Sequence, residues 1–368
     1  GCVVEKVDKI EPSLVAPPTQ ISSKAMYSPS QVLDMVSIDS IRSLSAIPLY
    51  GQGYNIAVLD SGIRETHETV RGKVIYSQNF SDDPMEDKFD HGTGIASVLA
   101  ATVPLSGILN MKVFNDKGYG STESVVDAIE ECITMHEQLP HIAPSVINLS
   151  IGAQDVGNPS DVLRVACREA VRRGIWVVAA AGNSGPEPGT IITPACDELV
   201  IAVGSLNPGS LYVSDFSSRG PTEEGIVKPD FVMFGENLSV ASSEGDEAST
   251  AGSGTSFAVP FMSGLCILCY DAMESRRILG NNNHADGLEE VEDIIEKYFP
   301  RFCMKLEGSP AGKDNDYGYG VPTGTYVAQA LRSDGNGNRA AAVPVLPAAL
   351  GGILSVSILG IMARMIKV

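Results

Sequence analysis

The sequence predicts an α/β fold of three layers, with a mainly parallel central sheet flanked by helices. Short apolar runs without polar alternation, such as Asn55–Leu59 and Ile175–Ala180, are typical of strands that are buried on both faces. Segments with a helical spacing of apolar residues, such as Ser124–His136, separate these runs along the chain. This alternation indicates a parallel sheet whose strands are joined by helical crossovers.

The expected elements follow one another in a regular order. The expected strands are Asn55–Leu59, Leu109–Phe114, Ser145–Leu149, Ile175–Ala180 and Leu199–Val203. The expected helices are Gly92–Ala101, Ser124–His136, Asp161–Arg173 and Ser256–Met273. Gly174 follows the third helix directly and is a typical residue at the end of a helix.

Composition excludes several classes of protein. The chain has 368 residues, of which 43% are hydrophobic and 19% charged, so it has enough apolar surface to fold and is not intrinsically disordered. Its length fits one large α/β domain with appendages, or two domains. The net charge of −19 repels phosphate groups, and we therefore expect no nucleic acid among its partners.

The seven cysteines are an odd number, so they cannot all pair within one chain. We interpret most of them as small buried apolar residues. Cys266 and Cys269 form a CxxC pattern, but no second CxxC and no pair of histidines accompanies it. We therefore predict no metal site at these cysteines.

The two ends of the chain differ in composition from its middle. Residues 1–35 are rich in proline, serine and polar groups, and we expect a tail or linker there. The folded domain is expected to span 36–331, and the polar segment 332–339 is typical of a flexible linker.

The segment 340–366 predicts a C-terminal hydrophobic helix that crosses a membrane. No residue is charged from Ala340 to Ala363, and a helix needs about 20 such residues to span a bilayer. Arg364 and Lys367 follow as interfacial anchors. The alternative is a C-terminal helix buried in the core.

Polar residues held by glycines stand where the strands end and the helices begin. Asp60 follows the first strand, Asn183 comes shortly after the fourth, and His91 and Ser256 lie at helix starts. In open parallel sheets, functional groups gather at the carboxyl ends of the strands. Taken alone, each residue is more often a cap, a turn or another structural residue than a functional one.

Together, these four residue types are the parts needed for covalent acyl transfer. A serine hydroxyl needs a neighbouring base to become a nucleophile, and histidine suits that role near neutral pH. A carboxylate on the other ring nitrogen fixes the tautomer of the histidine. An amide and a main-chain N–H at a helix start can bind the oxyanion.

Several motifs in this order closely resemble those of the subtilisin-like serine proteases (subtilases, peptidase S8), over about residues 37–330. They are IAVLDSGI (56–63), DHGTG (90–94), NLSIG (148–152), AAAGNSGP (179–186), FSSRGPT (216–222), KPDF (228–231) and GTSFAVP (254–260). The resemblance implies a subtilisin-like fold and a serine endopeptidase. It implies that Ser256 is the nucleophile, His91 the general base and then acid, and Asp60 the carboxylate that orients His91. Asn183 and the Ser256 N–H would form the oxyanion hole.

The resemblance also implies where a peptide or protein substrate binds. Two extended edges, Lys117–Ser121 and Ser150–Gly152, would flank the substrate backbone as neighbouring strands. The expected substrate-binding residues are Gly118, Gly120, Ser150, Ile151, Gly152, Ala181, Gly182 and Ile192.

Some positions depart from the pattern of the family. Ile192 stands where relatives usually carry glycine at the base of the primary specificity pocket, which predicts a preference for small or medium apolar P1 residues. The segment Thr102–Asn110 has no carboxylate, so we expect no calcium in the loop that often binds it. Calcium elsewhere stays open, and the chemistry itself requires no cofactor.

The sequence leaves other questions open. No long N-terminal pro-segment is visible, so one was cleaved or this branch does without it. Family habit favours a catalytic domain outside the cytoplasm, although the thiols weakly favour a reducing compartment.

Two other classes of protein compete with the endopeptidase. An inactive subtilase fold used for binding would predict loss of Asp60, His91, Asn183 or Ser256, and all four are present. An α/β-hydrolase would need G-x-S-x-G with its histidine last in order. In this chain the serine motif is Gly-Thr-Ser-Phe-Ala, and the histidine of the DHGTG motif precedes it.

Overall fold

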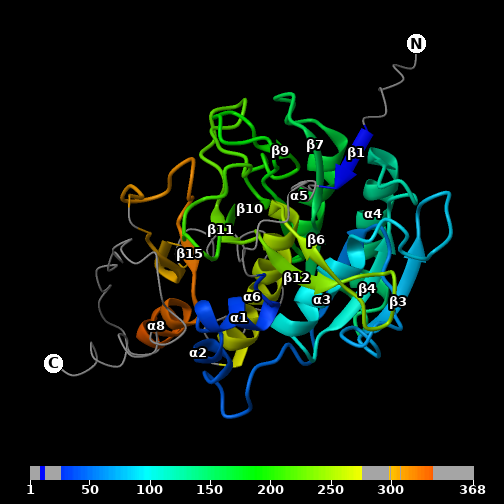
Figure 1. Cartoon of the computed structure of the whole chain (residues 1–368), viewed down its shortest axis with the longest axis horizontal. Coiled ribbons are helices and arrows are strands. Elements are labelled where there is room, and N and C mark those ends of the chain that lie inside the picture. Colours follow the sequence, from blue (N-terminus) through cyan, green and yellow to red (C-terminus); the bar gives the residue numbers. More distant parts are fainter. Residues whose placement is uncertain (1–8, 13–25, 276–297, 299, 307, 335–368) are drawn as a thin grey trace.

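A seven-stranded parallel sheet lies at the centre of the computed structural model (Figure 1), and the structure describes residues 9–12, 26–275, 298, 300–306 and 308–334. The strand order is β11-β10-β8-β6-β2-β4-β3, and every neighbouring pair is parallel. The strands are β2 (Asn55–Asp60), β3 (Val74–Asn79), β4 (Gly107–Lys112), β6 (Val146–Leu149), β8 (Trp176–Ala180), β10 (Ile201–Leu206) and β11 (Phe231–Phe234).

Two pairs of helices cover the sheet, one pair on each side (Figure 1). On one side α3 (Gly92–Thr102) packs against α6 (Thr255–Ser275), and on the other α4 (Thr122–Gln138) packs against α5 (Val162–Arg172). The central helix α6 contacts β6, β8, β10 and β11. The predicted three-layer α/β class is therefore confirmed.

Smaller elements surround this core. An antiparallel sheet has the order β5-β1-β7-β9, and two further antiparallel pairs are β12–β13 and β14–β15. Their bounds are β1 (Lys9–Pro12), β5 (Gly120–Ser121), β7 (Ile151–Gln154), β9 (Ile192–Thr193), β12 (Leu238–Ala241), β13 (Ser249–Gly252), β14 (Cys303–Met304) and β15 (Val321–Pro322). The remaining helices are α1 (Pro29–Met35), α2 (Asp39–Arg42) and α8 (Gly324–Asp334).

The structure corrects the expectation that residues 1–35 are only a tail or linker. Helix α1 begins after a capping box made by Ser28 and Gln31, and it buries Val32 and Leu33 in the core. Strand β1 belongs to a sheet. At the other end, α8 continues to Asp334, three residues beyond the expected domain boundary at 331.

The described residues give no support for a membrane anchor. Among them one helical segment, Thr255–Met273, is long and apolar enough to cross a bilayer, but it is 94% buried because it is the core helix α6. The predicted transmembrane segment 340–366 lies outside the described residues, as does most of the linker 332–339.

Buried thiols contribute to the apolar core. Six cysteines in the described part of the chain are buried, in agreement with the interpretation from sequence. Cys266 and Cys269 lie within α6, and the described residues contain no group of three or more histidine, cysteine or acidic side chains that could hold a metal.

Candidate active site

The carboxylate of Asp60 and the imidazole of His91 form a buried pair. Asp60 is the last residue of β2, and His91 immediately precedes α3. His91 Nδ1 lies 2.7 Å from Asp60 Oδ1, and each side chain is only 1% exposed. Because a carboxylate only accepts hydrogen bonds, Nδ1 carries the proton and Nε2 is left as the basic nitrogen.

The turn before His91 has an unusual backbone that is fixed by side chains. Asp90 has a φ of 65°, a left-handed conformation that aspartate tolerates better than most residues. Its carboxylate accepts a hydrogen bond from the Ser242 hydroxyl at 3.0 Å, and its N–H donates to Asp87 at 3.0 Å. These bonds define the direction in which His91 leaves the turn.

Ser256 reaches the same place from the start of α6. It is the second residue of that helix, and its carbonyl accepts a hydrogen bond of 2.8 Å from the Ser150 hydroxyl. The next residue, Phe257, packs its ring edge-on against the imidazole of His91, with 5.4 Å between centroids. Ser256 Oγ and His91 Nε2 are both buried and have no hydrogen-bond partner among the residues that the structure describes. Such catalytic contacts often tighten only when substrate is bound.

Asn183 faces the start of α6 with its amide already oriented. Its Oδ1 accepts hydrogen bonds from the main-chain N–H of Thr255 at 2.9 Å and from the Thr255 hydroxyl at 3.1 Å. These bonds leave Nδ2 as a buried donor that has no partner within the described ranges of the chain. The N–H of Ser256 lies in the first turn of α6, where N–H groups have no acceptor within the helix.

The two predicted substrate edges leave room for one strand between them. The chain's own strand β1 lies in that place. Ile10 pairs with Gly120 of β5, and Glu11 pairs with Gly152 of β7, both in antiparallel register. Gly118 lies in the turn that precedes β5. The backbone of an extended peptide therefore fits between these edges.

The side chain of Ile192 fills the space between two walls of the predicted specificity pocket. A Cβ atom added to Gly152 would lie 2.4 Å from Ile192 Cδ1, and one added to Gly182 would lie 2.8 Å from Ile192 Cγ2. Ala181, beside Gly182, is fully buried and accepts a hydrogen bond from the Ile192 N–H at 3.0 Å. The isoleucine thus lies between the segments 150–152 and 181–182.

A thiol near this pocket is chemically inert. Cys196 Sγ lies 3.3 Å from Oγ1 of Thr193, the residue that follows Ile192. Burial raises the pKa of the Cys196 thiol to about 12. Because the thiolate is the nucleophilic form, Cys196 does not compete as a nucleophile near neutral pH.

Sequence reasoning missed several polar residues that support the site. Ser61, Asp87 and Lys112 form a buried hydrogen-bond network next to the pair of Asp60 and His91. Thr255 orients the amide of Asn183. One signal was available, because Lys112 is an ionisable residue at the end of a strand that is otherwise uncharged and mostly apolar. The hydroxyls of Ser61 and Thr255 carried no comparable signal.

Comparisons with known proteins agree with this geometry. The model of the subtilase family matches residues 51–320. Serine protease AprX of Bacillus subtilis is 32% identical over 60% of this chain and 57% of its own length. Subtilisin-like protease SBT6.1 of Arabidopsis thaliana is 32% identical over 69% of this chain and 27% of its own length. Subtilisin of Bacillus sp. (strain TA39) is 29% identical over 74% of this chain and 67% of its own length.

This chain thus spans little more than half of the first of these relatives and about a quarter of the second. The family match covers most of the chain and includes Asp60, His91, Asn183 and Ser256. On this match, and on the parallel sheet that brings those residues together, the chain belongs to the subtilase family.

Proposed function

We propose that the chain is a serine endopeptidase that hydrolyses peptide bonds through an acyl-enzyme intermediate. The observation that carries this proposal is the meeting of three groups at the start of α6. They are the hydrogen-bonded pair of Asp60 and His91, the buried hydroxyl of Ser256, and the buried amide of Asn183, whose Nδ2 donor has no partner among the described residues.

The chemistry follows from these positions. Ser256 Oγ attacks the peptide carbonyl while His91 Nε2 takes its proton, and Asp60 stabilises the imidazolium that forms. The amide of Asn183 and the Ser256 N–H bind the oxyanion. His91 then gives the proton to the leaving amine, and water releases the acyl group by the same steps in reverse. Every group in this sequence comes from the chain, so the reaction needs no cofactor, and we continue to expect no calcium in 102–110.

The proposed substrate is a peptide in extended conformation that lies between β5 and β7. The pairing of β1 with both of these edges supports this position, since an extended backbone makes the same main-chain bonds whatever its source. The contacts of Ile192 with the region of Gly152 and Gly182 support a shallow pocket for a small or medium apolar P1 side chain.

Labelling with a fluorophosphonate probe tests the activity directly. Wild-type protein is expected to be labelled, because the probe reacts with a serine only when a base activates it. Ser256→Ala is expected to remain unlabelled, and Ser106→Ala, which removes a buried serine hydroxyl from the loop before β4, to be labelled like wild type. A folded wild-type protein that resists the probe would instead support the alternative, an inactive subtilase fold used for binding.

The N-terminal segment is expected to compete with substrate, as a pro-segment does. Strand β1 occupies the proposed substrate position, and Asp60, His91 and Ser256 are at most 1% exposed. Replacing both Ile10 and Glu11 with proline removes two main-chain donors that strand pairing needs. If the segment fills the cleft about 90% of the time, apparent KM for a short peptide falls about 10-fold while kcat stays the same.

Replacing Val3 and Val4 with proline serves as the control for this change, because both residues precede strand β1. Initial rates over a range of peptide concentrations separate KM from kcat. An unchanged KM in the Ile10/Glu11 variant, in a protein as stable as wild type, would show that the segment does not compete.

We also propose that the segment 340–366 anchors the protein in a membrane, with the catalytic domain outside the cytoplasm. The support is the uncharged run from Ala340 to Ala363. A chain that ends at Asp334, where α8 ends, is expected to move from the membrane fraction to the soluble fraction and to keep its activity. Loss of folding in that variant would indicate that the segment belongs to the core.

A further inference from the structure

Ser61 uses all of its polar groups in hydrogen bonds around the pair of Asp60 and His91. Its N–H donates to Asp60 Oδ1 at 2.7 Å, and its carbonyl accepts from Lys112 Nζ at 2.6 Å. Its hydroxyl donates to Asp87 Oδ1 at 2.8 Å and accepts from the N–H of Gly92 at 2.9 Å. Ser61 directly follows Asp60, and Gly92 directly follows His91, so this hydroxyl joins the two chain segments that carry the pair.

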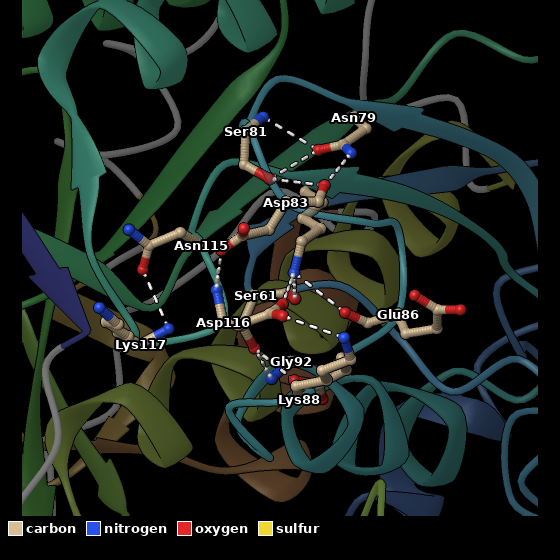
Figure 2. Close-up of polar contacts among 12 residues, drawn as sticks. Ser61, Asn79, Ser81, Asp83, Glu86, Lys88, Gly92, Asn115, Asp116 and Lys117 are labelled. Atoms are coloured by element: carbon tan, nitrogen blue, oxygen red, sulfur yellow. Dashed lines mark hydrogen bonds and ion pairs between the residues drawn. The ribbon is translucent and has the colours of Figure 1, made fainter.

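The segments approach each other too closely for any other residue at position 92. A Cβ atom there would lie 2.1 Å from the carbonyl oxygen of Gly62 and 3.2 Å from Asp60 Cβ. Figure 2 shows the hydrogen bond that the Gly92 N–H donates to the Ser61 hydroxyl. The short distance between the segments is what allows one serine hydroxyl to bridge them.

Asp87 holds that hydroxyl in place. Asp87 is only 6% exposed, and its carboxylate also accepts hydrogen bonds from the Asp90 N–H at 3.0 Å, the Thr93 N–H at 2.9 Å and the Thr93 hydroxyl at 2.6 Å. Burial raises the pKa of Asp87, and the bonds from Thr93 and Ser61 oppose that shift. A group that accepts from four donors acts as a carboxylate, and it fixes which way the Ser61 hydroxyl points its proton.

Lys112 holds the same residue from the other side. It is the last residue of β4, paired in register with Asp60 of β2, and its side chain is fully buried. Its ammonium group donates to the carbonyls of Ser61 and Glu86 and lies 3.7 Å from Asp116. The main chain of Ser61 therefore lies between a buried cation and a buried anion.

We propose that Ser61, held by Asp87 and Lys112, is a positioning residue that keeps Asp60 and His91 in the geometry needed for proton transfer from Ser256. The inference rests on the proposed endopeptidase function. Ser61 touches no substrate in this scheme, and it acts only through the segments that it joins.

Ser61→Ala tests the proposal with a change that adds no atoms. It leaves the Gly92 N–H without its acceptor and frees the turn that carries His91. Displacements of about 1 Å in a catalytic group can cost about 10²-fold, so we expect kcat to fall about 10- to 100-fold with KM little changed. Ser61→Thr keeps the hydroxyl and is expected to restore most of kcat.

Ser106→Ala is the matched control. Ser106 is also buried, and its hydroxyl donates to one main-chain carbonyl, that of Gly51 at 3.0 Å, beyond the opposite end of β4. It is expected to lower the melting temperature about as much as Ser61→Ala does and to leave kcat unchanged. Equal kcat in Ser61→Ala and Ser106→Ala would overturn the proposal.

A double-mutant cycle separates positioning from general destabilisation. If the hydroxyl of Ser61 acts between Asp87 and Gly92, Asp87→Asn and Ser61→Ala together should cost less than the product of their separate effects on kcat. Effects that multiply would mean that the two residues act independently, which contradicts the proposal.

A spectroscopic readout keeps the inference distinct from the proposed function. The proton between His91 Nδ1 and Asp60 is expected at low field in the proton NMR spectrum, and Ser61→Ala should shift or broaden it while Ser106→Ala should not. This readout needs no turnover. Inactive wild-type protein with the predicted spectral change would reject the proposed function alone, and an unchanged resonance in Ser61→Ala would reject the positioning role.

Discussion

Replacing Asn183 with alanine is expected to lower kcat by about 10²–10³ with little change in KM, a magnitude already known for an oxyanion-hole asparagine in this family. The Nδ2 atom of Asn183 is buried and has no partner in the described part of the chain, whereas its Oδ1 is held by Thr255. A donor in that arrangement interacts most strongly with the negative oxygen that exists only during the reaction. Its loss therefore affects the turnover step, and steady-state kinetics with a chromogenic peptide measure it.

Thr255→Val provides a graded companion to this variant. It removes the hydroxyl that donates to Asn183 Oδ1 but keeps the main-chain bond to the same atom. We expect a smaller fall in kcat, since the amide stays in place with one bond fewer. A fall in Thr255→Val as large as that in Asn183→Ala, or a change confined to KM in either variant, would contradict the assignment of the oxyanion donor.

Ile192→Gly is expected to raise kcat/KM for substrates with phenylalanine at P1, relative to alanine at P1, by about 10²-fold. In the present structure the isoleucine side chain occupies the space beside Gly152 and Gly182. Removing it leaves a deep apolar pocket that an aromatic ring can fill, whereas a ring in the wild-type pocket would overlap the isoleucine. Profiling with a set of peptides that differ only at P1 measures the change.

Ile192→Val is the control for this prediction, because it keeps a branched side chain at the same position. It should leave the preference for small or medium P1 residues largely intact. A wild-type enzyme that already prefers large aromatic P1 residues would show that Ile192 moves aside or lies outside the pocket, and the argument from its contacts would then be wrong.

The parts of the fold that sequence predicted well are those in which burial is complete. Strand β8 lies inside the sheet, and its five residues are all buried, so its apolar run has no other explanation. Strand β3 was missed because it lies at the edge of the sheet, where half-buried and exposed residues alternate. Helix α1 was missed because it has only seven residues, which is too short for a helical period to stand out in the sequence.

The candidate site also contains residues that the sequence predicts and residues that it does not. Asp60, His91, Asn183 and Ser256 stand beside glycines at strand ends and helix starts, and the topology of a parallel sheet brings such places together. Ser61, Asp87 and Thr255 are ordinary polar residues in sequence, and their roles depend on hydrogen bonds between distant segments. The strand β1 was also beyond sequence reasoning, since its partners are short edges more than a hundred residues away.

Helix α6 both completes the core and carries the proposed nucleophile. A nascent chain that has left the ribosome only as far as β11 already contains Asp60, His91 and Asn183. It still lacks Ser256, the proposed nucleophile. One side of its sheet also lacks α6, one of the two helices that cover it. Under the proposed function, a chain interrupted before α6 therefore cannot cut other proteins, and this ability arises together with the completed core.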